Sequence, residues 1–243
     1  MPERRAILFC GDPHGSFDHI LQVAQRLRPM AVILLGDLEP VRPLHVELDA
    51  IRDRLWFIYG NHDTASQTAF ENVFDSELAD CNIHGRVVTL PDGTRLAGVG
   101  GVFRTSVWSP PASPIYDSAE THARHTPRQD RWRSGPVRRH WGSIYPDVVK
   151  RLTNERADIL VTHEAPSCHP HGWGAIDNLA RALGVHSAFH GPGSPEQTVL
   201  PRWKMPSSSR PGDTTMRSLA PKRGPCTRGM YWSPSSACAG MSS

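Results

Sequence analysis

Six polar residues in this sequence are of types that bind metal ions or transfer protons, and each lies just after a short apolar run. They are Asp12, His14, Asp37, Asn61, His62 and His163. Carboxylate, amide and imidazole groups supply oxygen and nitrogen ligands, which suit Mn, Fe, Zn or Mg rather than Cu(I) or an iron–sulfur cluster. The set therefore indicates a metal site, provided that the fold brings the six residues together.

The apolar runs alternate with amphipathic segments, which predicts an α/β fold with buried strands. Strands are expected at 4–10, 31–37, 55–60, 157–166 and 185–191, with a hairpin over 85–101. Helices are expected at 16–27, with Ser16 as N-cap, and at 44–54, 146–156 and 175–184. Ligands in open α/β sheets gather at the carboxyl ends of strands, so the six residues should meet at one edge.

Composition divides the chain into a domain over residues 1–190 and a tail over 191–243. Pro, Gly and Ser supply 24 of the tail's 53 residues, whereas Ile, Leu and Val supply three. Such a segment buries too little apolar surface to offset its ordering entropy, so we expect it to be disordered. The tail is also basic, with seven Lys and Arg residues against two acidic ones, which leaves nucleic-acid contact open but unsupported.

Nothing in the sequence indicates a membrane or secretory location. Apolar runs long enough for a transmembrane helix are missing, and the N-terminal run is too short for a signal peptide. The five cysteines show no CxxC spacing, which argues against a zinc ribbon and a disulfide framework. We therefore expect a cytoplasmic protein that does not associate with membranes.

The motifs GDPHG, GD, GNHD and TH, each after an apolar strand, resemble those of the calcineurin-like metallophosphoesterase superfamily. The resemblance runs in order from residue 7 to about 190. It implies a sandwich of two mixed β-sheets flanked by helices, and a centre of two divalent metal ions, preferably Mn, with Fe, Zn or Mg as alternatives. Asp12 and His14 would bind the first metal, Asp37 both metals, and Asn61 and His163 the second.

The implied reaction is hydrolysis of a phosphate ester by a hydroxide that bridges the two metals. Paired metal ions lower the pKa of a shared water and clamp the phosphoryl oxygens. His62 would be the general acid for the leaving group, because an imidazole titrates near neutral pH. The substrate would be a small molecule, a nucleotide or a phosphoprotein.

The chain departs from the family pattern in the loop that follows Asp37. The family commonly has a second Asp three positions on, which steadies the catalytic histidine, and Pro40 stands there. Glu39 could substitute only if the loop adjusts, and Asp63 is another candidate partner for His62. Loss of the orienting group should slow catalysis rather than abolish it.

A second departure lies where the family usually has Gly-His-x-His after its last motif strand. The two histidine positions are Pro192 and Ser194 here, and neither replaces an imidazole ligand. His190, or less readily His186, could serve instead, because residues i and i+2 of a strand share a face. We hypothesise that the chain leaves its ancestral reading frame after Gly191 and so lacks its last strands. A Gly-His-x-His motif missing from both alternative frames would contradict this.

Two further regions bear on the substrate. His169 and His171 follow His163 closely and are candidates for lining the substrate's entrance, although surface histidines are equally ordinary. Residues 102–144 form an irregular insertion rich in Arg, Trp and Pro, a composition typical of a lid, a phosphate-binding segment or a solvated loop.

Three functions remain open from the sequence. The first is a metal-dependent phosphatase or phosphodiesterase. The second is a catalytically impaired relic of the same fold that has lost its last metal-binding motif. The third is a protein that binds phosphate or nucleic acid without turnover.

Overall fold

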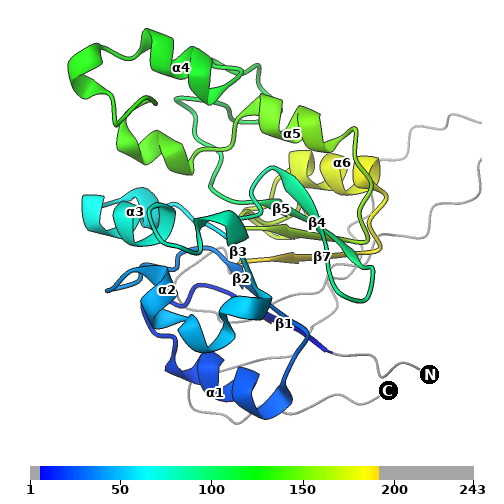
Figure 1. The fold of residues 1–243 in the computed structure, drawn as a ribbon. Helices are drawn as coiled ribbons and strands as arrows, with labels where there is room; N and C mark the ends of the chain where they lie inside the picture. Colours follow the sequence, from blue (N-terminus) through cyan, green and yellow to red (C-terminus); the bar gives the residue numbers. More distant parts are fainter. Residues whose placement is uncertain (1–5, 192–243) are drawn as a thin grey trace, which may run out of the picture.

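The computed structural model describes residues 6–191, which form two β-sheets packed face to face with helices on their outer sides (Figure 1). The tail expected at 191–243 therefore lies outside the described residues, apart from Gly191. The helices of residues 6–191 are all too short or too polar to span a bilayer.

The first sheet is parallel and has the strand order β1-β2-β3. Its strands are β1 (Ile7–Cys10), β2 (Ala31–Leu35) and β3 (Leu55–Ile58). The second sheet is mixed and has the order β4-β5-β6-β7. It comprises an antiparallel hairpin of β4 (Arg86–Thr89) and β5 (Arg95–Val99), followed by the parallel strands β6 (Ile159–Thr162) and β7 (Ser187–His190). The predicted sandwich is thus present, with one parallel and one mixed sheet in this part of the chain.

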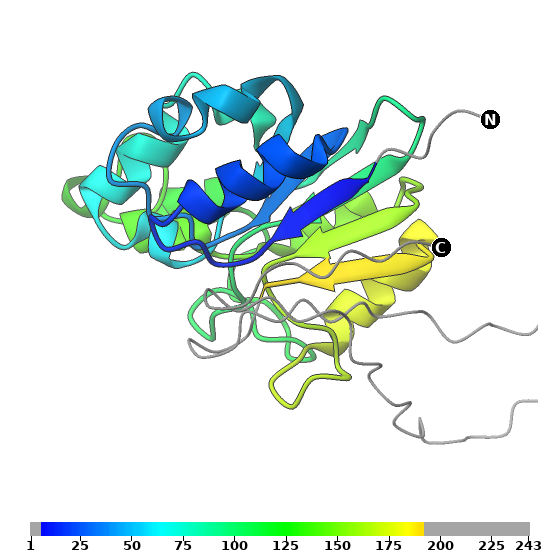
Figure 2. The same ribbon diagram turned by 90° about the horizontal axis from the view of Figure 1, so that it is seen from below.

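Alternation along the strands produces the layers. In β2, Val32 and Leu34 pack against the helices, whereas Ile33 and Leu35 face the second sheet. The inner layer is closed between β1 and β7 by stacked Phe9 and Phe189 rings, whose centroids are 3.9 Å apart. Figure 2 shows these two strands on the same side of the molecule.

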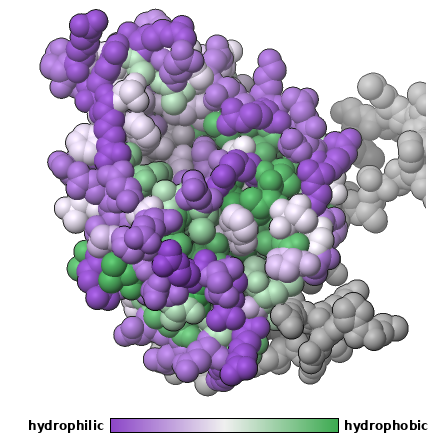
Figure 3. Space-filling view, viewed as in Figure 1, coloured by the Kyte–Doolittle hydropathy of each residue, from purple (hydrophilic) through white to green (hydrophobic). Residues whose placement is uncertain are grey.

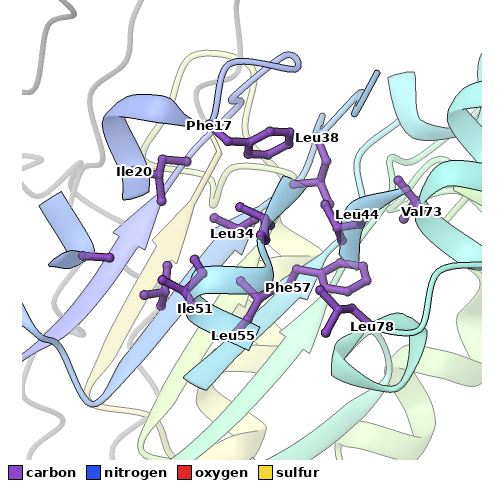
Figure 4. Packing of buried hydrophobic residues seen from close by; sticks show 13 residues of the cluster. Phe17, Ile20, Leu34, Leu38, Leu44, Ile51, Leu55, Phe57, Val73 and Leu78 are labelled. Atoms are coloured by element: carbon purple, nitrogen blue, oxygen red, sulfur yellow. The ribbon is translucent and has the colours of Figure 1, made fainter. Parts of the chain in front are cut away.

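Helices cover the outer face of each sheet. On the first sheet these are α1 (Asp18–Leu27), α2 (Leu44–Glu47), η1 (Asp49–Arg54) and α3 (Gln67–Phe74), with the short 3₁₀ helices η2 (His62–Thr64) and η3 (Ala79–Cys81) in the loops. Figure 4 shows their side chains meeting those of β2 and β3. The second sheet is covered by α5 (Pro146–Leu152) and α6 (Gly174–Leu183).

Two local predictions differ from the structure. The helix expected over 44–54 is broken at Leu48, which separates α2 from the 3₁₀ helix η1. Ser16 is not the N-cap of α1, because that position is Phe17, which has no capping side chain. Propensity and spacing set the approximate element, while tertiary packing sets its ends.

The insertion at 102–144 is folded rather than irregular throughout. It contains α4 (Ala119–His125), η4 (Arg128–Asp130) and η5 (Arg138–Gly142). The rings of Trp132 and Trp141 contact Phe70 of α3 edge-on, with centroids 5.7 and 5.2 Å away. Its helices are too short to give a visible periodicity in sequence. Its outer surface, at the top in Figure 3, is largely hydrophilic.

Candidate metal centre

Three of the predicted ligands meet at the carboxyl ends of their strands. Asp12 follows β1, Asp37 follows β2 and His163 follows β6, and one ligand atom from each lies within 4.8 Å of the others. His163 Nε2 is 3.5 Å from Asp37 Oδ2, and His163 Nδ1 is 4.0 Å from Asp12 Oδ1. All three side chains are largely buried. Both sheets therefore contribute to one site, as the strand-end motifs predicted.

The backbone around these ligands leaves no room for larger side chains. A Cβ atom on Gly60 would lie 2.1 Å from Asp37 Oδ1, and one on Gly36 would lie 2.4 Å from His163 Nδ1. Asp12 and Asp37 have φ angles of 40° and 47°, in the left-handed region. Such conformations in non-glycine residues cost about 1–3 kcal/mol each and cluster at functional sites.

Burial and mutual contact shift the pKa values of all three side chains. Burial, reinforced by the Asp37 charge, raises the pKa of Asp12 to about 7. Burial alone would lower the pKa of His163, but the hydrogen bond with Asp37 and the charges of Asp37 and Asp12 raise it to about 9. Burial would raise the pKa of Asp37, yet the His163 partner outweighs it and lowers that pKa.

Two details fit a divalent cation at this position. Asp12 Oδ1 is buried and has no hydrogen-bond partner among residues 6–191, and such an acceptor is costly unless a cation or a donor satisfies it. His163 Nδ1 donates to the Leu35 carbonyl at 2.9 Å. Histidines that bind metals usually donate their other ring N–H in this way, which here leaves Nε2 as the ligand atom.

Glu39 lies between two histidines at the open side of the centre. Its Oε2 is 2.5 Å from His14 Nδ1, and its Oε1 is 3.6 Å from His62 Nδ1. Burial would lower the pKa of His14, but Glu39 and Asp37 raise it. His62 is half exposed, and its backbone N–H donates to Asp37 Oδ1 at 2.9 Å. The predicted general acid is therefore accessible to a substrate.

Asp63 occupies a different place from the one expected for a catalytic residue. It is fully buried, and its carboxylate accepts hydrogen bonds from the backbone N–H groups of Glu39 at 2.9 Å and Gly60 at 2.8 Å. Burial raises its pKa to about 6. Asp63 ties the loops after β2 and β3 together, and no hydrogen bond to the His62 ring is present in residues 6–191. The carboxylate that lies near the His62 ring is that of Glu39, with Oε1 3.6 Å from His62 Nδ1.

The remaining predicted ligands are arranged less simply. Asn61 lies directly after the Gly60 that follows β3, next to His62, and its side chain is partly buried. His190 ends β7 and is buried, but it does not join Asp12, Asp37 and His163. Its Nδ1 bonds the Gly191 carbonyl at 2.7 Å, and its Nε2 has no partner.

Gly191, which directly follows β7, lies against the centre. A Cβ atom placed there would lie 3.1 Å from both Asp12 Oδ1 and His163 Nδ1. The ring of His190 instead lies 6.0 Å from that of His169, measured between centroids. The other predicted substrate-contacting residue, His171, has its ring 5.9 Å from His169 and is exposed. His169 and His171 thus lie beside the end of β7.

A groove of about 600 Å³ adjoins the centre at His14. It is lined by Phe17 and Leu21 of the α1 region, by Val46 of α2 and by Arg42, which forms a bidentate pair with Glu47. The groove offers space for a leaving group beside His14. Apart from His14 and Gly15 of the GDPHG motif, its residues carry no recognisable motif in the sequence, because they meet only after α1 and α2 pack.

Comparison with known proteins identifies the family of this chain. The family model for calcineurin-like phosphoesterases matches residues 5–191. An uncharacterised protein of Haemophilus influenzae is 42% identical over 185 residues, which are 76% of this chain and 81% of the relative. The crystal structure of TT1561 of Thermus thermophilus superposes with a TM-score of 0.50 at 16% identity, covering 77% of this chain and 81% of that one. That likeness concerns the fold. By the match over residues 5–191 and the strand-end ligands it contains, this chain belongs to the calcineurin-like phosphoesterase family.

Proposed function

We propose that this chain hydrolyses a phosphate monoester or diester at a centre of two divalent metal ions. The observation that carries the proposal is the convergence of Asp12, Asp37 and His163, with one unsatisfied Asp12 oxygen buried among them. Family membership supports metal-dependent phosphoesterase chemistry in general. Mn²⁺ is our preferred metal, because oxygen and imidazole ligands suit it.

Asp12, Asp37 and His163 would hold the metal ions, together with His14 and Asn61 at the edge. The metal ions would supply a polarised phosphoryl group and a water of lowered pKa. Asp37 is suited to contact both ions, because a carboxylate has two oxygens available for coordination.

His62 would donate a proton to the leaving oxygen. Its ring is half exposed at the open side of the centre, and its backbone is fixed by the hydrogen bond to Asp37. Glu39 would hold the ring by its Nδ1 side, which leaves Nε2 to face the substrate. Asp63 would fix the loops that carry Glu39 and Gly60 relative to each other through its hydrogen bonds to their backbone N–H groups.

A second candidate function follows from the position of His190. The three ligands that meet closely suffice for one well-held metal ion, and His190 is not among them. A catalytically impaired member of the family, which binds metal but turns over slowly, would have this arrangement.

Hydrolysis of p-nitrophenyl phosphate and its bis ester in Mn²⁺ separates the two functions. Asp37→Asn and His62→Ala should each lower the rate by at least about 100-fold, in the range of lost metal ligands and general acids. Asp53→Asn and His125→Ala are matched controls, because both residues are exposed and lie in η1 and α4 rather than in the loops that carry the proposed ligands. Absence of turnover in the folded wild-type chain, with metal bound, would support the impaired form.

A further inference from the structure

The two ends of the insertion border the metal centre. At one end, the backbone N–H of Phe103 donates to Oε1 of Glu164, the residue after His163, at 2.9 Å. At the other end, the Arg138 guanidinium donates to the carbonyls of Thr64 and Ala65 at 3.3 and 3.0 Å, just after His62. The residues next to these anchors are Arg104 and Arg139.

These two arginines differ from most others in the insertion. Arg133 pairs with Asp75, Arg124 pairs with Glu120, and Arg131 donates to the Thr126 carbonyl. Within residues 6–191, neither Arg104 nor Arg139 forms an ion pair with a carboxylate. The Arg104 Nε is buried without a hydrogen-bond partner, and the Arg139 Nε donates only to a neutral acceptor, His140 Nε2, at 3.3 Å.

Positive charge accumulates around this pair. Burial, followed by the charge of Arg139, lowers the pKa of Arg104. Burial also lowers the pKa of His140 to about 4, and the charges of His122, Arg139 and Arg104 add to the effect.

The nearby carboxylate of Glu164 is already engaged. It accepts hydrogen bonds from the Phe103 N–H and from Trp173 Nε1 at 3.0 Å. The charge of Glu164 offsets part of the cost at Arg104, and an anion that joined both guanidinium groups would offset more of it. The planar forks of arginine match the oxygens of a phosphate or carboxylate bidentately.

We propose that Arg104 and Arg139 bind a second anionic group of the substrate, a phosphate or a carboxylate, beside the ester that is cleaved. This inference rests on the proposed function for its substrate. The anion-binding site itself depends only on the two arginines. The preferred substrates are therefore small phosphate esters that carry at least one further anionic group.

A nucleic-acid backbone fits the same chemistry less well. Such a ligand needs a row of free cations and exposed aromatic faces. Most arginines of the insertion are engaged within the protein, and Trp132 and Trp141 pack against Phe70. The charges of Arg104 and Arg139 act on each other, and the segments that carry them are anchored at Glu164 and at Thr64 and Ala65.

Binding of tripolyphosphate to protein stripped of metal over a chelating resin tests the site independently of turnover. By calorimetry, Arg104→Met and Arg139→Met should each weaken binding at least tenfold relative to the wild type. Arg124→Met is the matched control, because Arg124 is exposed in the same insertion and paired with Glu120, and it should bind as the wild type does. If Arg104→Met does not fold, tripolyphosphate binding by the Arg139→Met variant, whose altered residue is exposed, still tests the proposal. Equal binding by the wild type and the Arg139 variant would overturn the proposal, as would tighter binding of a 20-base-pair DNA duplex than of tripolyphosphate.

Turnover separates this inference from the proposed function. In Mn²⁺, the wild type should prefer fructose 1,6-bisphosphate over fructose 6-phosphate by at least tenfold in kcat/KM, and both arginine variants should reduce that ratio. If tripolyphosphate binding depends on the two arginines but no ester is hydrolysed, the anion site is supported and the proposed phosphoesterase function is refuted. If the esters are hydrolysed but the ratio of the two kcat/KM values is the same in both arginine variants as in the wild type, the phosphoesterase function is supported and the anion site is refuted.

Discussion

Glu39 Oε1 lies 3.6 Å from Nδ1 of His62, while the other oxygen of the same carboxylate contacts His14. One side chain thus positions both a proposed metal ligand and the proposed general acid. Glu39 also has a left-handed φ of 43°, and its backbone N–H is held by Asp63. This conformation brings the Glu39 carboxylate close to both histidines, and we propose on that ground that Glu39 stands in for the aspartate that Pro40 replaces.

Glu39→Gln should lower kcat for p-nitrophenyl phosphate by about 10- to 100-fold, the usual effect of losing an orienting partner. The neutral amide keeps the size of the side chain but weakens its hold on both imidazoles. KM should change much less, because Glu39 does not contact the phosphate in this proposal. Glu77→Gln, which alters an exposed carboxylate paired with Arg52, should leave kcat unchanged. Equal kcat in wild type and Glu39→Gln would remove Glu39 from the mechanism.

Gly60→Ala should weaken Mn²⁺ binding at least tenfold, because the added methyl group would overlap Asp37 Oδ1. The clash is with the ligand itself, so the carboxylate must move. Gly174→Ala is the control, since a Cβ atom there meets no other atom within 4 Å. Calorimetric titration of both variants with Mn²⁺ measures the difference. Unaltered affinity in Gly60→Ala would mean that Asp37 is not a ligand in its present position.

Mn²⁺ affinity should rise as pH increases from about 6 to 9. The pKa values of Asp12, about 7, and His163, about 9, lie above their ordinary values, so both groups carry protons at pH 6. A metal ion binds only the deprotonated forms and must displace these protons. Titrations in buffers of different ionisation enthalpy should show at least two protons released at pH 6, because His14, a further proposed ligand with a raised pKa, adds to Asp12 and His163. Fewer protons should be released at pH 8. Heats that are independent of the buffer at both pH values would contradict this assignment.

Acid should destabilise the fold partly through His84. Burial, together with the charge of Arg151, lowers its pKa to about 4, although the Gly100 N–H bond to Nδ1 opposes the shift. Below pH 6.5 the unfolded chain therefore gains a proton that the folded chain does not. This costs up to about 1.4 kcal/mol per pH unit between 6.5 and 4. Urea unfolding at pH 7 and 5 should show a smaller loss for His84→Gln than for the wild type or for the exposed-site variant His125→Gln. The same loss in all three chains would exclude His84 as the cause.

Much of the centre could be predicted because its ligands are tied to strand ends. Once β1, β2 and β6 are recognised as buried strands, the residues that follow them must share an edge, and Asp12, Asp37 and His163 do so. The strands themselves are visible in the sequence as short apolar runs. The order of the strands in the two sheets is not visible, because a strand of four residues carries no information about which strand it pairs with.

Other features depend on tertiary contacts that leave no local pattern. The Leu35 carbonyl that orients His163 is 128 residues away in sequence. The sequence does not show whether Asp63 acts in catalysis or holds loops together. Its two hydrogen bonds from backbone N–H groups depend on the folded loops and leave no sequence signal. Arg104 and Arg139 are two among seven arginines of the insertion, and the sequence does not show that their charges act on each other or that their neighbours Phe103 and Arg138 are anchored beside the centre.

Strand periodicity alone does not predict where the His190 side chain lies. The alternation of β7 turns Ala188 to the helices and Phe189 to the inner layer, and His190 lies opposite Thr162 rather than His163. Register therefore places Gly191 next to the ligands. The substitutions at Pro192 and Ser194 lie outside the described residues, and translation of the alternative frames past codon 191 remains their test.

The most direct test is anomalous diffraction from crystals of the full chain soaked in Mn²⁺. The account predicts two anomalous peaks, both within about 2.3 Å of Asp37 oxygens, one also bound by Asp12 and the other by His163 Nε2. A single peak at these ligands would favour the impaired form. No peak at coordination distance from any of the three would contradict the metal centre itself.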